Sequence, residues 1–298
     1  MELILNTNEF GVAPFLDTAV DAIIIGLKNF CINQPFSLSI KELKESIKEI
    51  KNKGKKVYLS VNIFALEKDI VKFKKKANKL VELDIDGFIV SDLGILNVLK
   101  ELNLENKVIL DCQTYVTNNY SAKSLLNLGV NRICLSKEIT LEDIKNIAIS
   151  STGNVELLAQ GYYPITYSKR PILSCYLKNF KLKKNSSLYY IKEETREDFY
   201  YLLENKNSLT VFNNKQYSLF CYLDELKKNS INHLRIDTLF LKEEEIKEYI
   251  EIYHKAIVAI ENNNRETYTA LKKEFNAKFT YSTPFLHNGS FLLKEESK

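Results

Sequence analysis

The stretch Val155–Tyr176, VELLAQGYYPITYSKRPILSCY, joins a buried strand to a polar loop. Its first five residues form a short apolar run typical of a strand, and Gln160-Gly161 ends that run. The loop that follows carries two adjacent cations, Lys169 and Arg170, ahead of Pro171. Loops after buried strands are common ligand sites in α/β proteins, and Arg can clamp a phosphate or carboxylate with two parallel hydrogen bonds. We therefore expect Lys169-Arg170 to bind an anion, with a solvated loop as the alternative.

The same strand-to-loop pattern repeats along the chain before and after this stretch. Ser39 begins one of the intervening helices, with Glu42 three residues on as a capping box, and Gly54 follows its end. Apolar runs predict strands, and apolar residues at helical spacing predict helices. The predicted strands are 3–5, 21–26, 56–61, 86–90, 107–110, 131–135, 155–159 and 233–236, and the predicted helices are 10–20, 39–53, 68–83, 93–102, 121–128, 140–148 and 242–262.

Eight strands that alternate with helices predict an α/β fold, a TIM (β/α)8-type barrel. A doubly wound open sheet is the rival, but that fold usually needs fewer strands and a Gly-rich first turn, and the sequence has no GxGxxG or P-loop pattern. Residues 1–161 and 230–265 are assigned to the barrel. Residues 162–229 are assigned to a small β-rich insertion between strands 7 and 8, and residues 266–298 to a C-terminal tail with one helical piece and an irregular end.

The insertion is expected to contain short antiparallel strands over the barrel mouth. Asn213-Asn214 suits a tight hairpin between the second and third of them. These strands are predicted at 188–191, 208–212 and 216–220.

Composition limits the class of protein. The chain has 298 residues, a net charge of +4 and 45% hydrophobic residues, which together indicate a globular protein and permit, without requiring, a nucleic-acid partner. It has no leader pattern at its start and no apolar run of bilayer length, so we expect a cytoplasmic protein without a membrane partner. Its five cysteines are widely spaced without a CxxC pair, which favours free thiols over a zinc site or a disulfide framework.

Polar side chains stand where the predicted strands end, and a barrel would bring them to one mouth. Asp92 and Glu138 are the candidate catalytic acids or bases, because a carboxylate in a semi-enclosed mouth can exchange protons. Helix capping by Asp92, and a local ion pair of Glu138 with Lys137, are the alternatives. No metal site is expected from the three histidines. The candidate substrate-binding side chains at the same mouth are Asn62, Gln113, Asn118 and Asp237.

Several motifs, in a shared order, resemble peptidase family U32, the collagenase-like peptidases. Lys169-Arg170 within SKRPIL, and Arg235-Ile-Asp237 with Tyr253 in the next helix, resemble the branch of tRNA hydroxylation proteins from low-GC Gram-positive bacteria. The resemblance covers about residues 1–260. The family-like motifs are DGFIVSDLGIL at 86–96, QTYVTN at 113–118, LSKEIT at 135–140 and the strand-end Gly161.

This resemblance implies a barrel enzyme that modifies RNA, with hydroxylation of the wobble uridine of tRNA and a dicarboxylate such as prephenate as a required metabolite. It also implies an iron–sulfur cluster in many members, held by cysteines after the strand-end glycine. In this chain Pro164 and Pro171 stand at such positions, and Cys175 and Cys221 alone cannot supply four thiolates. We therefore expect no cluster on this chain and a paralogous, cysteine-bearing partner subunit that holds it.

Three functions follow from the resemblance. The favoured one is a subunit of a tRNA hydroxylation system, with tRNA and a small dicarboxylate as partners. A collagenase-like peptidase is the second, although the sequence offers no clear Ser/His/Asp, Cys/His or zinc arrangement. A non-catalytic partner of the cysteine-bearing paralogue is the third.

Overall fold

The computed structural model describes residues 1–112, 115–183, 188–192, 194–195, 199–205 and 208–282, and the backbone of residues 285–287 and 290–292. Gln113, one of the predicted binding residues, lies outside this part of the chain.

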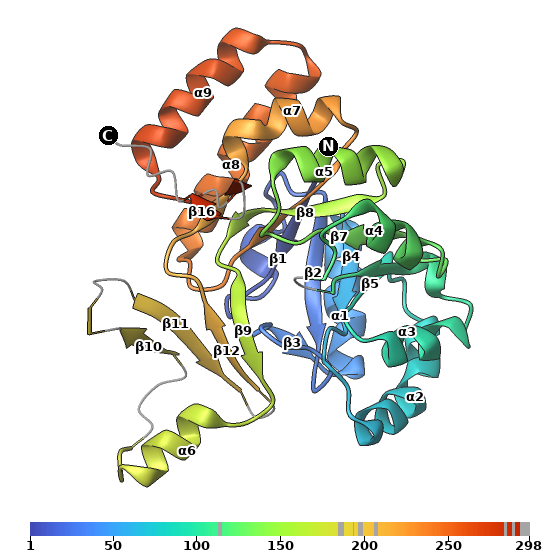
Figure 1. The fold of residues 1–298 in the computed structure, drawn as a ribbon. Helices are drawn as coiled ribbons and strands as arrows, with labels where there is room; N and C mark the ends of the chain where they lie inside the picture. The colour runs from blue at the N-terminus through green and yellow to red at the C-terminus, as the bar shows by residue number, and fades with distance from the viewer. Residues whose placement is uncertain are drawn as a thin grey trace.

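Within these residues, eight parallel strands close into a barrel (Figure 1). Each strand pairs with the next along the chain, and the last pairs with the first, where Asn6 lies opposite Asp237. The TIM-type barrel predicted from the sequence is therefore confirmed. The barrel strands are β1 (Glu2–Asn6), β2 (Ala22–Leu27), β4 (Lys56–Ser60), β5 (Gly87–Val90), β6 (Val108–Leu110), β7 (Arg132–Cys134), β8 (Val155–Gly161) and β14 (His233–Asp237), and a two-residue strand β3 (Ser37–Leu38) extends the sheet beside β2.

Helices cover the outside of the barrel after most of its strands (Figure 1). The Ser39 hydroxyl accepts a hydrogen bond from the Glu42 amide, and the Glu42 carboxylate accepts one from the Ser39 amide, so the predicted capping box is present. These helices are α1 (Ile40–Asn52), α2 (Glu67–Val81), α3 (Leu93–Lys100), α4 (Asn119–Leu126), α5 (Leu141–Ser150) and α8 (Glu243–Glu261), and a short helix η2 (Glu105–Lys107) precedes β6.

The helix predicted over residues 10–20 is wrong. That segment holds only the single turn η1 (Ala13–Phe15). Gly11 has a positive φ of 74°, which no α-helix accommodates, and Pro14 lacks the amide that a longer helix would need.

A separate antiparallel sheet follows β8 and extends away from the barrel, with α6 (Ile172–Asn179) against it (Figure 1). Glu204 fixes that helix, because its carboxylate accepts hydrogen bonds from the Leu173 and Ser174 amides. The predicted strands at 188–191 and 208–212 are present. The strand order is β10 (Leu188–Lys192), β11 (Phe199–Glu204), β12 (Leu209–Phe212) and β9 (Pro164–Ser168).

The hairpin predicted around Asn213-Asn214 is wrong. The strand that follows, β13 (Tyr217–Ser218), pairs with β8 of the barrel and not with β12. Asn213 explains this path, since its side chain accepts a hydrogen bond from the Tyr163 amide at 2.9 Å and donates to the Lys215 carbonyl. The chain is thereby turned back toward the barrel.

Two further helices and a packed aromatic cluster lie beside α8. Phe220 stacks on Phe275 with ring centroids 4.1 Å apart, and Tyr253 meets Phe220 edge-on at 5.1 Å. No helix among the described residues is long and apolar enough to cross a membrane. The remaining elements are η3 (Phe220–Tyr222), α7 (Leu223–Lys228), α9 (Arg265–Lys278), β15 (Phe285–His287) and β16 (Ser290–Leu292), of which the last two form a hairpin where the sequence predicts an irregular end.

Candidate functional site

The inside of the barrel is built from alternate residues of each strand, because neighbouring side chains of a strand point to opposite faces. A small layer of buried, mostly apolar side chains crosses this interior. Charged side chains lie on both sides of it, so this barrel departs from the usual interior of branched apolar residues. The layer consists of Ile4, Ala22, Ile24, Tyr58, Ile89, Ile109 and Cys134.

At the end of the barrel where the strands begin, Glu2 is the centre of a compact group of charges. Its carboxylate accepts hydrogen bonds from the Tyr58 hydroxyl at 2.7 Å and from Lys56 Nζ at 2.8 Å, and it lies 2.7 Å from His233 Nδ1. Burial alone would raise the pKa of Glu2. The His233 contact and the charge of Arg132 outweigh burial and hold this pKa well below its usual range. Glu2 is therefore ionised at neutral pH and compensates the cations around it.

Glu156 is fully buried at the centre of the barrel between two arginines. Its carboxylate accepts a hydrogen bond from Arg132 Nε at 2.8 Å and another from Arg235 Nε at 2.6 Å. Burial opposes ionisation, but Arg235 and Arg132 lower the pKa of Glu156. Arg132 also lies over the Tyr58 ring at 4.9 Å. The pairings satisfy the requirement that a buried charge be compensated.

Arg235 connects this centre to the barrel mouth. Its Nη1 donates to Asp111 Oδ2 at 2.7 Å, and its Nη2 contacts Cys134 Sγ at 3.1 Å. Lys137 approaches the same carboxylate, with Nζ 3.9 Å from Asp111 Oδ1. Since that distance exceeds a hydrogen bond, the Lys137 ammonium is the cation best placed to contact a bound anion.

Asp237 is a carboxyl group at this mouth with a perturbed pKa. It accepts hydrogen bonds from Asn6 Nδ2 at 2.9 Å and from the Leu239 amide at 3.1 Å. Burial raises the pKa of Asp237 in spite of these bonds and of the nearby cations Arg235 and Lys137. An acid held this way can give or take a proton closer to neutral pH than an ordinary aspartate.

These groups surround one pocket at the carboxyl ends of the strands, where TIM-type barrels hold their ligands. Asn6 is buried in its wall, and its Oδ1 has no hydrogen-bond partner within the described residues. Asn62 lines it too, and its Oδ1 fixes the loop after β2 by accepting a bond from the Ile32 amide at 2.8 Å. Its charged lining consists of two cations, Lys137 and Arg235, and two carboxyl groups, Asp111 and Asp237. The pocket residues are Asn6, Ile32, Asn33, Asn62, Asp111, Cys134, Leu135, Lys137, Leu158, Tyr162, Tyr163, Pro164, Phe212, Arg235 and Asp237.

The predicted acid–base pair is not part of the pocket lining. Asp92 begins α3, where Oδ1 accepts hydrogen bonds from the Gly94 and Ile95 amides and Oδ2 accepts one from the Ala65 amide at 2.9 Å. Glu138 follows β7, half-buried, and neither carboxylate lines the pocket. Their catalytic roles stay predictions, and the observed contacts of Asp92 are those of a helix cap.

The predicted anion-binding loop lies elsewhere. Lys169 and Arg170 come after β9, which carries the chain away from the barrel, and they precede α6 (Figure 1). Asn118 is an exposed N-cap of α4 that accepts a bond from the Ser121 amide at 2.9 Å. Of the predicted binding residues in the described part of the chain, Asn62 and Asp237 line the pocket, and Lys169, Arg170 and Asn118 do not.

Sequence reasoning missed the buried charges of the barrel. Arg132, Glu156 and Arg235 sit within apolar strands, and Asp111 directly follows one. Their position in the sequence could have revealed these charges. Each one alternates with apolar residues on a strand that the barrel buries on both faces. A charge there must point inward and needs a partner.

The thiols of this chain do not fit an iron–sulfur cluster. Cys175 is exposed on α6, whereas Cys221 contacts the Tyr281 hydroxyl at 3.2 Å beside α9. Cys134 is enclosed in the barrel against Arg235, and burial raises its pKa well above the usual value. Among the described residues, no group of three or more Cys, His, Asp or Glu could hold a metal ion. A cluster on a partner subunit stays a prediction.

The fold and the pocket define a TIM-type barrel protein with a charged pocket at its mouth. The model of Peptidase family U32 matches residues 10–294, so the chain belongs to that family. The family resemblance inferred from the motifs is confirmed.

Three relatives illustrate the range of the family. The chain is 21% identical to tRNA hydroxylation protein P2 of Bacillus subtilis (strain 168), over 92% of this chain and 90% of that protein. It is 25% identical to tRNA hydroxylation protein P of Helicobacter pylori (strain J99), over 74% of this chain and 56% of that protein. It is 32% identical to an uncharacterized protease of Methanocaldococcus jannaschii, over 54% of this chain and 40% of that protein. The chain thus spans about half the length or less of the last two.

Proposed function

We propose that this chain acts in the hydroxylation of tRNA, as a subunit of a system that modifies the wobble uridine at ring carbon 5. Membership of Peptidase family U32 supports this proposal, together with full-length similarity to a protein named for tRNA hydroxylation. The pocket at the barrel mouth is the observation that carries it.

The chemistry of that pocket suits a small acid and a polar base. Lys137 and Arg235 would meet a carboxylate, and the amides of Asn6 and Asn62 would meet the polar edge of a uracil or a metabolite. Asp237 would hold or release a proton at the bound ligand. We extend the proposal to a dicarboxylate such as prephenate as the bound metabolite, and to a cysteine-bearing paralogue as the partner that carries any cluster.

Proteolysis is the less favoured function. His233 contacts Glu2 at the opposite end of the barrel from the pocket. Burial raises the pKa of Cys112 to about 11 and holds that of Cys134 well above its usual value. Neither thiol is activated as a nucleophile at neutral pH. Within the described residues, the pocket therefore lacks a histidine-activated nucleophile.

Deletion of the gene in its native host tests the proposal. We expect tRNA from the deletion strain to lose wobble-uridine hydroxylation, measured by mass spectrometry of digested tRNA, and the wild-type gene to restore it. Asp237→Asn and Lys137→Ala should restore it poorly. Unchanged hydroxylation in the deletion strain, together with cleavage of a peptide library by the pure protein, would refute the proposal.

A further inference from the structure

Three aromatic side chains lie side by side on one face of the antiparallel sheet. Tyr190 of β10 stands opposite Tyr201 of β11, which stands opposite Phe212 of β12. The ring centroids of Tyr190 and Tyr201 are 5.2 Å apart. The other face of the sheet packs on α6 through residues such as Leu202 and Val211. The three rings, called the aromatic row below, are therefore not part of that small core.

The aromatic row begins in the wall of the pocket and ends in solvent. Phe212 is buried and lines the pocket. Tyr201 is half-buried and stacks on Phe240 of the loop after β14, with centroids 4.7 Å apart and planes 9° apart. Tyr190, on the edge strand, is 55% exposed. The aromatic row thus runs from the pocket wall to the outside of the insertion, and Tyr190 is its exposed end.

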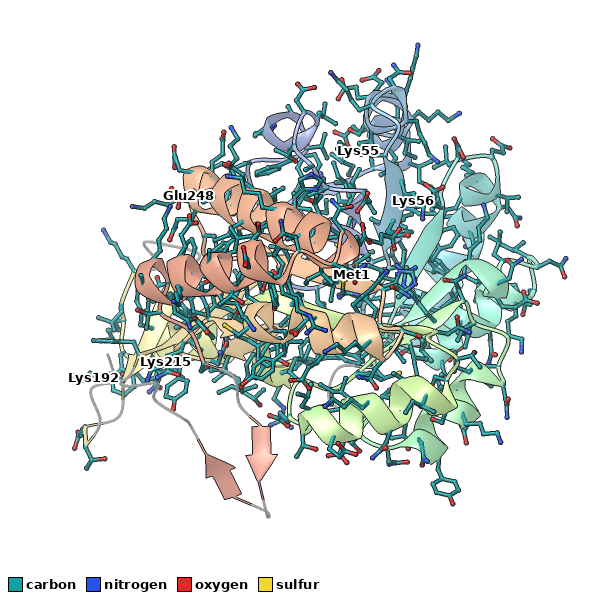
Figure 2. The ribbon with its side chains drawn as sticks, turned by 90° about the horizontal axis from the view of Figure 1, so that it is seen from above. Met1, Lys55, Lys56, Lys192, Lys215 and Glu248 are labelled. Atoms are coloured by element: carbon teal, nitrogen blue, oxygen red, sulfur yellow. The ribbon has the colours of Figure 1, made fainter. Side chains whose placement is uncertain are left out.

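A second exposed ring and a cation extend the outer end of the row. Phe199 is 52% exposed, and its centroid lies 6.3 Å from that of Tyr190. Lys192 lies over Phe199, with Nζ 5.2 Å from the ring centroid. Figure 2 shows Lys192 at the outer edge of the molecule, far from Lys55 and Lys56. Exposed aromatic side chains grouped in this way mark binding surfaces in most proteins.

We propose that the exposed end of the aromatic row, Tyr190 with Phe199 and Lys192, is a stacking platform for unpaired bases of an RNA loop that leads to the pocket. This inference rests on the proposed function and names how the RNA is held. Open aromatic faces beside a cation are the feature that binds single-stranded nucleic acid without reading its sequence. The aromatic row leads to the pocket, and this continuity favours RNA over a protein partner. When one base is stacked at the outer end, the next nucleotides of the same strand can extend toward the pocket.

Binding of an RNA stem–loop by the full chain, purified from its native host, tests this platform. Each stacked base contributes about 1–3 kcal/mol, so we expect Tyr190→Ala and Phe199→Ala each to weaken binding by about 5- to 150-fold. Tyr190→Phe should keep the affinity, because it keeps the ring. Tyr176→Ala removes an equally exposed tyrosine, 54% exposed on α6, and should leave the affinity unchanged. The same RNA closed into a duplex should bind weakly to every variant.

Other results would overturn the platform. Undiminished RNA binding by both alanine variants would do so. Alanine variants that lose a co-purifying protein in place of RNA would do so too, because this face would then be a protein interface. Circular dichroism confirms that each variant is folded. Tyr190→Phe provides the comparison if Tyr190→Ala does not fold.

The platform and the proposed function fail separately. A deletion strain that loses hydroxylation, with alanine variants that bind RNA normally, overturns only the platform. A deletion strain with normal hydroxylation, with alanine variants that lose RNA binding, overturns only the function.

Discussion

Gly161, the last residue of β8, lies directly against the backbone of Asp237. A Cβ placed on Gly161 would come within 2.4 Å of the Asp237 carbonyl oxygen, and Gly161 itself has a φ of 129°. The strand that leads into the insertion therefore passes the candidate acid at a separation that only glycine permits.

Gly161→Ala should destabilise the protein and displace Asp237. The backbone conformation alone costs about 1–3 kcal/mol for a non-glycine residue, and the clash adds to it. Gly54→Ala is the matched control, since Gly54 also has a positive φ, 71°, but has no atom within 4 Å of its added Cβ. Urea denaturation should show the larger loss for Gly161→Ala. Equal losses would mean that the Asp237 backbone yields without cost.

Asp92 can be tested as a cap or as a catalyst by two substitutions. Asn caps helices about as well as Asp, whereas Ala loses the cap and costs about 0.5–2 kcal/mol. An Asn oxygen can still accept the hydrogen bonds from the Gly94 and Ile95 amides, although the bond from the Ala65 amide is lost. We therefore expect Asp92→Asn to be more stable than Asp92→Ala and to restore tRNA hydroxylation in the deletion strain. A stable Asp92→Asn protein that restores nothing would instead assign Asp92 to the chemistry.

The barrel was predictable from the sequence because its signals are local. Apolar runs followed by helical spacing mark the cycles, and Ser39 caps its helix where expected. The insertion was less predictable. The strands β9 and β11 were missed, and Asn213 makes contacts with Tyr163 and Lys215 that no hairpin pattern contains.

The pocket was predictable in part. Strand ends indicated Asn62 and Asp237, because the carboxyl ends of barrel strands meet at one mouth. The loop of Lys169 and Arg170 follows β8 in sequence, but β9 lies between them and carries these cations away. The charges around Glu156 depend on which side of each strand faces inward, which is fixed only once the barrel is closed.

Glu156→Gln should strongly destabilise the fold. It removes the carboxylate that compensates Arg132 and Arg235 inside the barrel, and breaking a buried ion pair costs about 3–5 kcal/mol. Glu251→Gln, which breaks the exposed pair with Lys255, should have no measurable effect. Urea midpoints at neutral pH compare the two. A small loss for Glu156→Gln would mean that water enters the barrel interior and solvates the arginines.

The pH dependence of this effect has a defined sign. The pKa of Glu156 is lower in the folded protein than its ordinary value of 4.5, so its contribution is present above that pH and is lost as the pH falls. The difference in stability between wild type and Glu156→Gln should therefore shrink on acidification. A difference that grows on acidification would contradict the ionised state of Glu156.

The contribution of Asp237 to stability should depend on pH with the opposite sign. Its pKa is raised above the ordinary value of 3.8, so its protonated form is the one that folding favours, and its contribution is lost as the pH rises through the folded pKa. Asp237→Asn resembles the protonated form at every pH. Relative to this variant, wild type should lose stability as the pH rises from about 4, measured by urea denaturation at a series of pH values. Asn6 Nδ2 donates to Oδ2 and the Leu239 amide donates to Oδ1, so an Asn side chain keeps an acceptor for one of these two donors, and the variant should fold. A stability difference that does not change with pH would mean that Asp237 titrates as an ordinary aspartate, and it would remove the basis for its role in proton transfer.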